Sequence, residues 1–265
     1  MNGFAFINIQ QSPDLYYKRY SQPKKKFGDP QINNDGTFRM REIIRPIYTL
    51  KMLQKELNSQ LKELELPDCM YGGIEERNNL VNAFQHINNK YFFTIDLKKF
   101  FNNITNSHVH QTLVGRGLNW SDARTITNLT TYKGSLPQGA PTSTTLANLV
   151  FAPTVEFLEK FCKERNITFT VFVDDLTFSS SQCFRRHTPQ ILEALQKNGF
   201  FVNNNKIHYR ENCCEITGII IRRGKLFLPK EILSHQNKPG VKKYIAAVLK
   251  QYDLLKEASQ LKKPE

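Results

Sequence analysis

Residues 168–178 have the sequence TFTVFVDDLTF, in which two apolar runs flank a pair of adjacent aspartates, Asp174 and Asp175. Short runs of β-branched and aromatic residues are typical of strands, so the pattern predicts a strand, a tight turn and a second strand. Two ionised carboxylates about 4 Å apart repel by roughly 4 kcal/mol at an effective dielectric of about 20, and a fold that holds them together usually supplies cations. Taken alone, such a pair is more often a solvated hairpin turn.

A third carboxylate fits the same scheme. The apolar run at residues 91–95, YFFTI, predicts a buried strand that ends at Asp96. If this strand lies beside the other two, Asp96, Asp174 and Asp175 meet at one edge of a sheet. Carboxylate oxygens suit Mg²⁺, with Mn²⁺ as the alternative.

The composition narrows the class of protein. The 265 residues are enough for one domain or two closely packed subdomains. The formal charge of +13 favours a polyanionic partner, with nucleic acid ahead of an anionic membrane. No apolar stretch approaches the length of a membrane span, and the N-terminus lacks a basic region before an apolar core. The five cysteines show no zinc or redox-motif spacing, so we expect a soluble, cytoplasmic protein with no membrane partner.

Periodicity and turn residues predict the other elements of a mixed α+β chain. Residues 1–34 show no clear period and are expected to form an adaptable basic arm. Helices are expected at residues 50–64, 75–86, 142–163, 189–198 and 241–257, with a further helix capped by Ser121. Strands are expected at residues 37–46, 200–202, 214–221 and 226–228.

Five segments, taken in order, resemble the motif series of reverse transcriptases, and most closely the bacterial retron type and its defence-associated relatives. They are REIIRP at 41–46 with Leu50 and Lys51, DLKKFF at 96–101, LPQGAPTS at 136–143 with Asn148, FVDD at 172–175, and the segment from Gly199 to Lys206. Residues 82–86 and 216–218 resemble two shorter marks of the retron type. Two departures are Phe172, where the family usually carries tyrosine, and the short segment after Pro229, which puts processivity in doubt.

The resemblance implies an α+β right-hand polymerase with fingers and palm subdomains and a short helical thumb. The expected division is a basic arm at 1–34, fingers at 35–90 with part of 105–135, palm at 91–229 and thumb at 230–265. The implied function is RNA-directed DNA polymerisation on a cognate structured noncoding RNA, within bacterial anti-phage defence. The implied partners are that RNA, the RNA–DNA hybrid product, deoxynucleotides and an effector protein.

The resemblance also implies a site for two Mg²⁺ ions, held by Asp96, Asp174 and Asp175 with the backbone carbonyl of Leu97. The other expected site residues fall into four groups. Arg39, Arg41 and Arg45 would clamp the triphosphate, or they are merely solvated charges. Phe101 would exclude a 2′ hydroxyl, and Gln138 and Gly139 would let the backbone approach the nucleotide or form an ordinary loop. Lys206 would donate a proton to pyrophosphate or bind a template phosphate.

Two alternatives stay open on the sequence. The first is a catalytically silent polymerase-like scaffold that binds RNA or an effector protein, against which three intact aspartates argue. The second is an intron-type reverse transcriptase or an RNA-templated RNA polymerase. The lack of an evident maturase or endonuclease extension and the aromatic ring of Phe101 argue against the second alternative.

Overall fold

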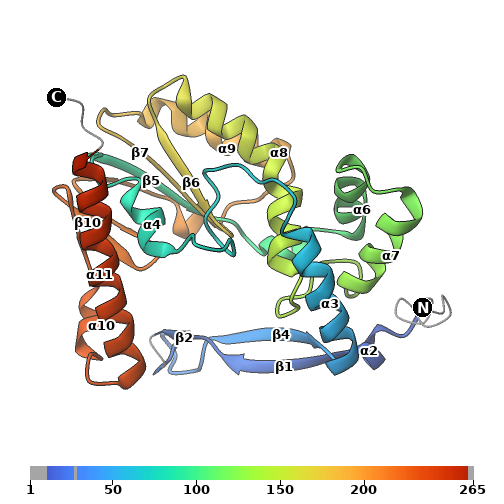
Figure 1. Cartoon of the computed structure of the whole chain (residues 1–265). Helices are drawn as coiled ribbons and strands as arrows, with labels where there is room; N and C mark the ends of the chain where they lie inside the picture. Colours follow the sequence, from blue (N-terminus) through green and yellow to red (C-terminus); the bar gives the residue numbers. More distant parts are fainter. Residues whose placement is uncertain (1–10, 27–28, 262–265) are drawn as a thin grey trace.

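The computed structural model describes residues 11–26 and 29–261 (Figure 1). Its central element is a four-stranded antiparallel sheet in the order β6-β7-β5-β8. The strands are β5 (Tyr91–Asp96), β6 (Thr168–Phe172), β7 (Asp175–Ser180) and β8 (His208–Glu211). The β6–β7 hairpin confirms the strand, turn and strand predicted from the apolar runs.

Helices cover both faces of this sheet, because its strands are apolar on both sides. α8 (Ser143–Lys163) and α9 (Thr188–Lys197) pack on one face, where Phe93 contributes to the main core and Phe169 stacks on Phe178 with ring centroids 4.5 Å apart (Figure 1). Phe92 points to the opposite face. It belongs to a second core with α4 (Asn79–Phe84) and α11 (Pro239–Leu261). Both α8 and α9 confirm the expected helices.

A long two-stranded ribbon runs along the lower edge of the molecule in Figure 1. β1 (Tyr17–Pro23) pairs antiparallel with β4 (Met40–Pro46), after the short helix α2 (Pro13–Tyr16). The expectation of an arm without regular structure is therefore wrong for residues 17–23. The tip of the ribbon carries the small pair β2 (Lys25–Lys26) and β3 (Asp29–Pro30), and residues 1–10 lie outside the described part of the chain.

The ribbon is anchored at its base by buried hydrogen bonds. The hydroxyl of Tyr17 donates to the carbonyl of Leu129 and accepts from Nε2 of Gln54 at 2.9 Å. Gln54 lies on α3 (Tyr48–Leu61), which ends three residues before the expected end at Leu64. Leu129 lies on α7, so one buried cluster joins the ribbon, α3 and α7.

Short helices fill the region between β5 and α8. They are α5 (Phe100–Asn103), α6 (Asn106–Gly115) and α7 (Trp120–Thr130). The expected cap at Ser121 is wrong, because the side chain of Asn119 accepts from the backbone N–H of Asp122 and starts α7 two residues earlier. α4 is also shorter than expected, since its cap is Asn78.

The C-terminal part differs most from the sequence-based expectation. Residues 200–202 contribute only a single bridge, Leu97 to Val202, and the fourth strand of the sheet is β8 instead. The expected strand 214–221 is two strands, because Thr217 and Gly218 both have positive φ and form a turn. The resulting sheet has β9 (Cys213–Ile216), β10 (Ile219–Arg222) and β11 (Lys225–Phe227), followed by α10 (Lys230–Ser234) and α11.

The two retron-type marks meet in space. Asn82 donates through Nδ2 to the hydroxyl of Thr217 at 3.3 Å. His86 is fully buried, with its ring nitrogens 2.6 Å from the hydroxyl of Ser179 and 2.7 Å from that of Thr170. Burial lowers the pKa of His86 to about 3, so the ring is neutral. These residues tie the α4 segment to the palm sheet and to the β9–β10 turn.

Among the helices of the described residues, none is both long and apolar enough to cross a bilayer.

Candidate active site

The three aspartates come from two adjacent strands and the turn between β6 and β7. Asp96 pairs in register with Asp175, and the backbone N–H of Leu97 donates to the carbonyl of Asp174 at 2.9 Å. Val173, which starts the turn, has a φ of 60°, a conformation that costs energy for a β-branched residue. The sheet therefore fixes the relative positions of Asp96, Asp174 and Asp175, as the sequence predicts for neighbouring strands.

Burial and neighbouring negative charges perturb two of these carboxyl groups. Burial, together with the negative charges of Asp174 and Asp96, raises the pKa of the Asp175 carboxyl to about 7. Burial and the charge of Asp96 also raise the pKa of Asp174. A cation shared by these carboxylates would stabilise their charged forms.

The side chain of Asp96 is held by the segment that follows α9. The ammonium of Lys206, at the end of the 3-10 turn Asn204–Lys206, forms an ion pair with Oδ2 of Asp96. The backbone N–H of Asn203 donates to the carbonyl of Asp96 at 2.9 Å. Sequence reasoning selected Lys206 but missed Asn203, because a lone asparagine beside a turn carries no distinctive signal.

A small cavity of about 160 Å³ lies between the aspartates and the β9–β10 turn. Asp96, Asp175 and Lys206 line it on one side, and Glu215 and Thr217 line it on the other. Glu215 is a further carboxylate that sequence reasoning missed. Its strand register relative to the palm cannot be derived from local pattern.

The donor chemistry of the site fits a hard divalent cation. Asp96, Asp174 and Asp175 offer only carboxylate oxygens, which Mg²⁺ and Mn²⁺ prefer. In the stretches that the structure describes, no three His, Cys, Asp or Glu side chains already surround one point as ligands. The fit therefore rests on ligand type and on the raised pKa of Asp174 and Asp175 beside Asp96.

Basic side chains from the ribbon face these aspartates. The positive charge of Arg41 lowers the pKa of Asp174, against the larger effect of burial. Burial lowers the pKa of Lys24, and the charges of Arg39, Arg41 and Lys206 lower it further. Arg45 is placed differently, with its guanidinium carbon 5.8 Å from the centroid of the Tyr20 ring. The structure thus brings Arg39 and Arg41, with Lys24, toward the aspartates.

The expected nucleotide-facing residues occupy two places. Phe100 is buried in the main core, and Phe101 is half-buried with its ring 5.6 Å from that of Phe100.

The carbonyl of Gln138 accepts from the backbone N–H of Ile44 at 2.9 Å. Gly139 has a φ of 124°, and a Cβ there would lie 2.6 Å from Cγ2 of Ile43. The loop therefore packs against the ribbon, and glycine is required for that close approach.

The aspartate turn is supported from behind by the loop before α4. The backbone N–H of Tyr71 donates to the carbonyl of Val171 at 2.7 Å, and Nδ2 of Asn148 donates to the carbonyl of Gly72 at 2.8 Å. A Cβ on Gly72 would lie only 2.4 Å from the backbone nitrogen of Val173. The turn and this loop are therefore in direct backbone contact.

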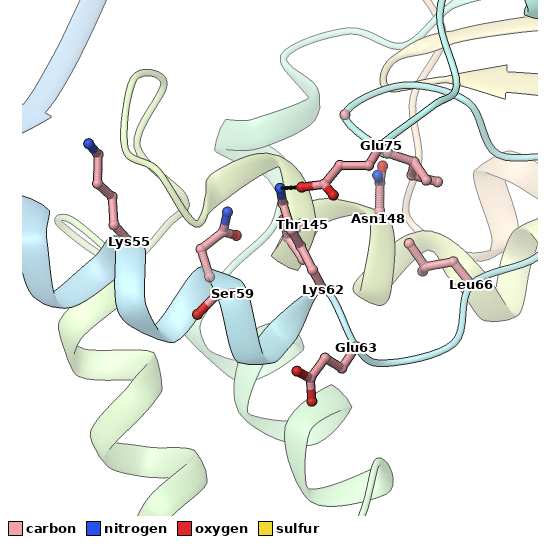
Figure 2. Close-up of a pocket in the computed structure, with 11 residues that line it drawn as sticks. Lys55, Ser59, Lys62, Glu63, Leu66, Glu75, Thr145 and Asn148 are labelled. Atoms are coloured by element: carbon pink, nitrogen blue, oxygen red, sulfur yellow. Dashed lines mark hydrogen bonds and ion pairs between the residues drawn. The ribbon is translucent and has the colours of Figure 1, made fainter.

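A larger cavity of about 500 Å³ lies where α3 meets α8 (Figure 2). The ion pair between Lys62 and Glu75, with a nitrogen–oxygen distance of 2.6 Å, crosses it. Asn148 lines it as well, on the side of the Gly72 loop. None of the three aspartates lines this cavity, so it is distinct from the aspartate cluster.

The carboxylates lie at the end of an antiparallel sheet, and cations from a separate ribbon lie opposite them. This is the arrangement of palm and fingers in a right-hand nucleic-acid polymerase. Residues 23–221 match the family described as reverse transcriptase (RNA-dependent DNA polymerase). Because the match covers most of the chain, the protein belongs to this family, and the prediction of an RNA-directed DNA polymerase is confirmed. Enzymes of this family use divalent metal ions.

Curated relatives confirm the resemblance to the retron type. The chain is 27% identical to the retron Ec83 reverse transcriptase of Escherichia coli, over 85% of this chain and 75% of the relative. It is 29% identical to the retron Ec86 reverse transcriptase of the same species, over 82% of this chain and 67% of the relative. The retron Mx65 reverse transcriptase of Myxococcus xanthus is 26% identical over 78% of this chain, which spans about half of that relative.

Solved structures confirm the fold class. Telomerase from Candida albicans, in complex with a fragment of telomeric RNA, matches with a TM-score of 0.52 and 10% identity, over 85% of this chain and 50% of that one. Apo telomerase from Candida tropicalis matches with a TM-score of 0.50 and 12% identity, over 84% of this chain and 59% of that one. At this identity the likeness concerns the fold alone.

Proposed function

We propose that the protein copies a structured noncoding RNA into DNA by two-metal-ion nucleotidyl transfer at Asp96, Asp174 and Asp175. The observation that carries the proposal is the register of Asp96 opposite Asp175, beside a turn that holds Asp174. Burial and neighbouring carboxylates raise the pKa of Asp174 and Asp175, so this cluster is costly to keep together unless cations bind there. A scaffold without catalysis would have no use for such a cluster.

Two bound Mg²⁺ ions would supply a nucleophilic 3′ oxygen and neutralise charge on the departing pyrophosphate. Asp96 and Asp174 are the proposed principal ligands, with Asp175 and the carbonyl of Leu97 in support. Lys206 forms an ion pair with Asp96. Its proposed role is to bind a phosphate or donate a proton to pyrophosphate. Mn²⁺ is the alternative metal.

The remaining site residues are proposed to position the nucleotide. The charge of Arg41 acts on Asp174, and those of Arg39 and Arg41 act on Lys24, so these guanidinium groups are proposed to bind triphosphate oxygens. Phe101, half-buried beside the buried Phe100, is the proposed barrier to a 2′ hydroxyl. Gln138 and Gly139 hold the loop against the ribbon, so their contact with a nucleotide is a proposal that rests on the family resemblance.

The basic surface supports an RNA template and an RNA–DNA hybrid as partners. A charge of +13 favours phosphate contacts, whose affinity falls steeply with salt. That the template is a cognate noncoding RNA is proposed from the retron names of the curated relatives. An effector protein, a place in anti-phage defence and a cytoplasmic location stay predictions.

Primer extension tests the proposal. Purified protein is given primed homopolymer RNA, Mg²⁺ and either deoxynucleotides or ribonucleotides. Asp174→Asn should abolish synthesis, because it removes a ligand charge, while RNA affinity stays within severalfold of the parent. Asp253→Asn, on the exposed side of α11, is the matched control and should behave as the parent.

The outcomes separate the alternatives. Extension with deoxynucleotides alone supports the proposal, and extension with ribonucleotides alone supports an RNA polymerase. No extension from any primer, with RNA binding intact, supports the scaffold. Sequencing the nucleic acid that copurifies with the protein would identify the template, the product and the junction between them.

A further inference from the structure

The only tryptophan of the chain lies on an exposed surface. Trp120 begins α7 and is 60% exposed, although tryptophan is highly buried on average. The helix pair α6 and α7 lies at the right-hand edge of the molecule in Figure 1, beyond α8 and away from the aspartate turn. An exposed tryptophan there has no role in the core or in the catalytic site.

Two cationic or titratable side chains surround the indole. The guanidinium carbon of Arg124 lies 5.3 Å from the centroid of the Trp120 ring. The His110 ring stands edge-on to it, with centroids 5.3 Å apart and an interplanar angle of 73°. The second contact of His110 is with the backbone, since its Nε2 is 3.3 Å from the carbonyl of Trp120. The indole is thus held in place by neighbours on α6 and α7.

The indole borders a shallow cavity of about 450 Å³. Polar side chains share the lining, namely Asn106, Ser107, Thr127 and Asn128. No carboxylate of the described residues lines the cavity. An occupant that stacks on the indole and accepts a neighbouring positive charge would match these features.

We infer that Trp120 and Arg124 form a stacking site for an unpaired base of the bound RNA, outside the polymerase centre. This inference rests on the proposed function, since it takes RNA as the partner. An indole beside a guanidinium is a platform for any base. The larger ring system of adenine stacks more strongly than that of uracil, so the site should prefer adenine.

A nucleic acid fits this surface better than a protein does. A protein interface usually needs a broad apolar centre around its aromatic anchor. Here the exposed large apolar side chains of α6 and α7 are only Trp120 and Val114 among the described residues, and the surroundings of the indole are amides, hydroxyls and a guanidinium. The net charge of the chain favours the polyanion as well.

Because the chain has one tryptophan, its fluorescence reports on this site alone. The intact protein is titrated with a short oligoadenylate RNA, with an oligouridylate of equal length, and with an abasic ribose–phosphate oligomer of equal charge. Oligoadenylate should quench the fluorescence saturably, oligouridylate should quench less, and the abasic oligomer should have no effect. Binding measured in parallel by anisotropy without any quenching would overturn the inference.

Variants give the second readout. Trp120→Ala should weaken oligoadenylate binding about fivefold or more, and Trp120→Phe should restore most of it. Phe157→Ala removes another aromatic of similar exposure, 58%, on α8, and should leave binding unchanged. Equal affinity of Trp120→Ala and the parent for oligoadenylate would overturn the inference. If the variant also loses a copurifying protein, the surface binds that protein and not RNA.

Failure of this site and failure of the proposed function give different results. Trp120→Ala should keep the parental kcat for primer extension at saturating RNA template and raise the KM for that template, since the indole is outside the polymerase centre. A parent that extends primers and shows no quenching refutes the stacking site alone. A parent that shows base-dependent quenching and extends no primer refutes the polymerase and leaves the stacking site.

Discussion

Replacing Gly72 by alanine should displace the catalytic aspartate turn. A Cβ at Gly72 would lie 2.4 Å from the backbone nitrogen of Val173, 2.5 Å from Cγ2 of Val173 and 2.8 Å from the backbone carbon of Phe172. Ordinary contact begins at 3.4 Å, so relief of the closest contact requires a movement of about 1 Å. Two of the three atoms are backbone, and rotation of a side chain cannot remove the clash.

Of the two segments that would clash, we expect the aspartate turn to move and the Gly72 loop to stay in place. Gly72 is held on its other side by the hydrogen bond from Asn148 on the long buried helix α8. A displacement of about 1 Å at a reacting group can reduce the rate roughly 100-fold, and overpacking of this kind costs about 1–3 kcal/mol of folding free energy. We therefore expect Gly72→Ala to reduce kcat for primer extension about 100-fold while RNA affinity changes little.

The measurement compares kcat, RNA affinity and urea unfolding for Gly72→Ala and a control. Gly115→Ala, at the end of α6, is the control because nothing lies within 4 Å of its added Cβ and its φ is not positive. It should keep the parent rate and gain up to about 1 kcal/mol of stability. A Gly72→Ala variant with parental kcat would show that the turn does not depend on this backbone contact, and the reasoning would be refuted.

Two further predictions concern the aromatic pair and the buried histidine. Phe101→Ala should admit ribonucleotides in primer extension, whereas Phe100→Ala should instead lose about 3–5 kcal/mol of stability in urea unfolding, because Phe100 is a core residue; unchanged sugar discrimination in Phe101→Ala would place the barrier elsewhere. Burial lowers the pKa of His86 to about 3, below its unfolded value of about 6.5, so stability is complete above pH about 6.5 and falls by about 1.4 kcal/mol per pH unit below it. His86→Asn should flatten this dependence between about pH 6 and pH 4 in urea titrations, and an unchanged slope would assign the effect to other groups.

The palm was predictable because its strands are buried on both faces. β5, β6 and β7 appear in the sequence as apolar runs, and α8 as a long apolar helix. The proximity of Asp96 to Asp175 then required only that the runs be neighbours. The order of the five motifs resembles that of reverse transcriptases, and this resemblance predicted that the strands are neighbours.

β1 and β8 were not predicted, because they bury few residues, and neither were the two-residue strands β2 and β3. Only Tyr17 of β1 is buried, and the other residues of that strand are exposed or half-buried, so its sequence YKRYSQP shows no alternation. β8 has the sequence HYRE at the edge of the palm sheet and has no buried residue. Their pairing comes from partners far along the chain, which local pattern cannot reveal. The position of Lys24 close to Asp96 could not be predicted for the same reason.

The halves of the site are held with unequal strength. The aspartate turn is fixed by strand register, the Leu97 hydrogen bond and the Gly72 contact. The ribbon that carries Arg39, Arg41 and Lys24 is anchored at its base by Tyr17, far from those cations along the strands.

At the ribbon tip, Asp29 contacts the segment between α10 and α11 through Nε2 of His235 at 2.6 Å and the ammonium of Lys238 at 2.8 Å, as far as the described residues show. These pairs are exposed to solvent, where such contacts contribute little stability. The aspartates, which the proposed mechanism requires in fixed positions, therefore lie on the more strongly held half of the site. The ribbon cations, which are proposed to bind a triphosphate, lie on the half with fewer anchoring contacts among the described residues.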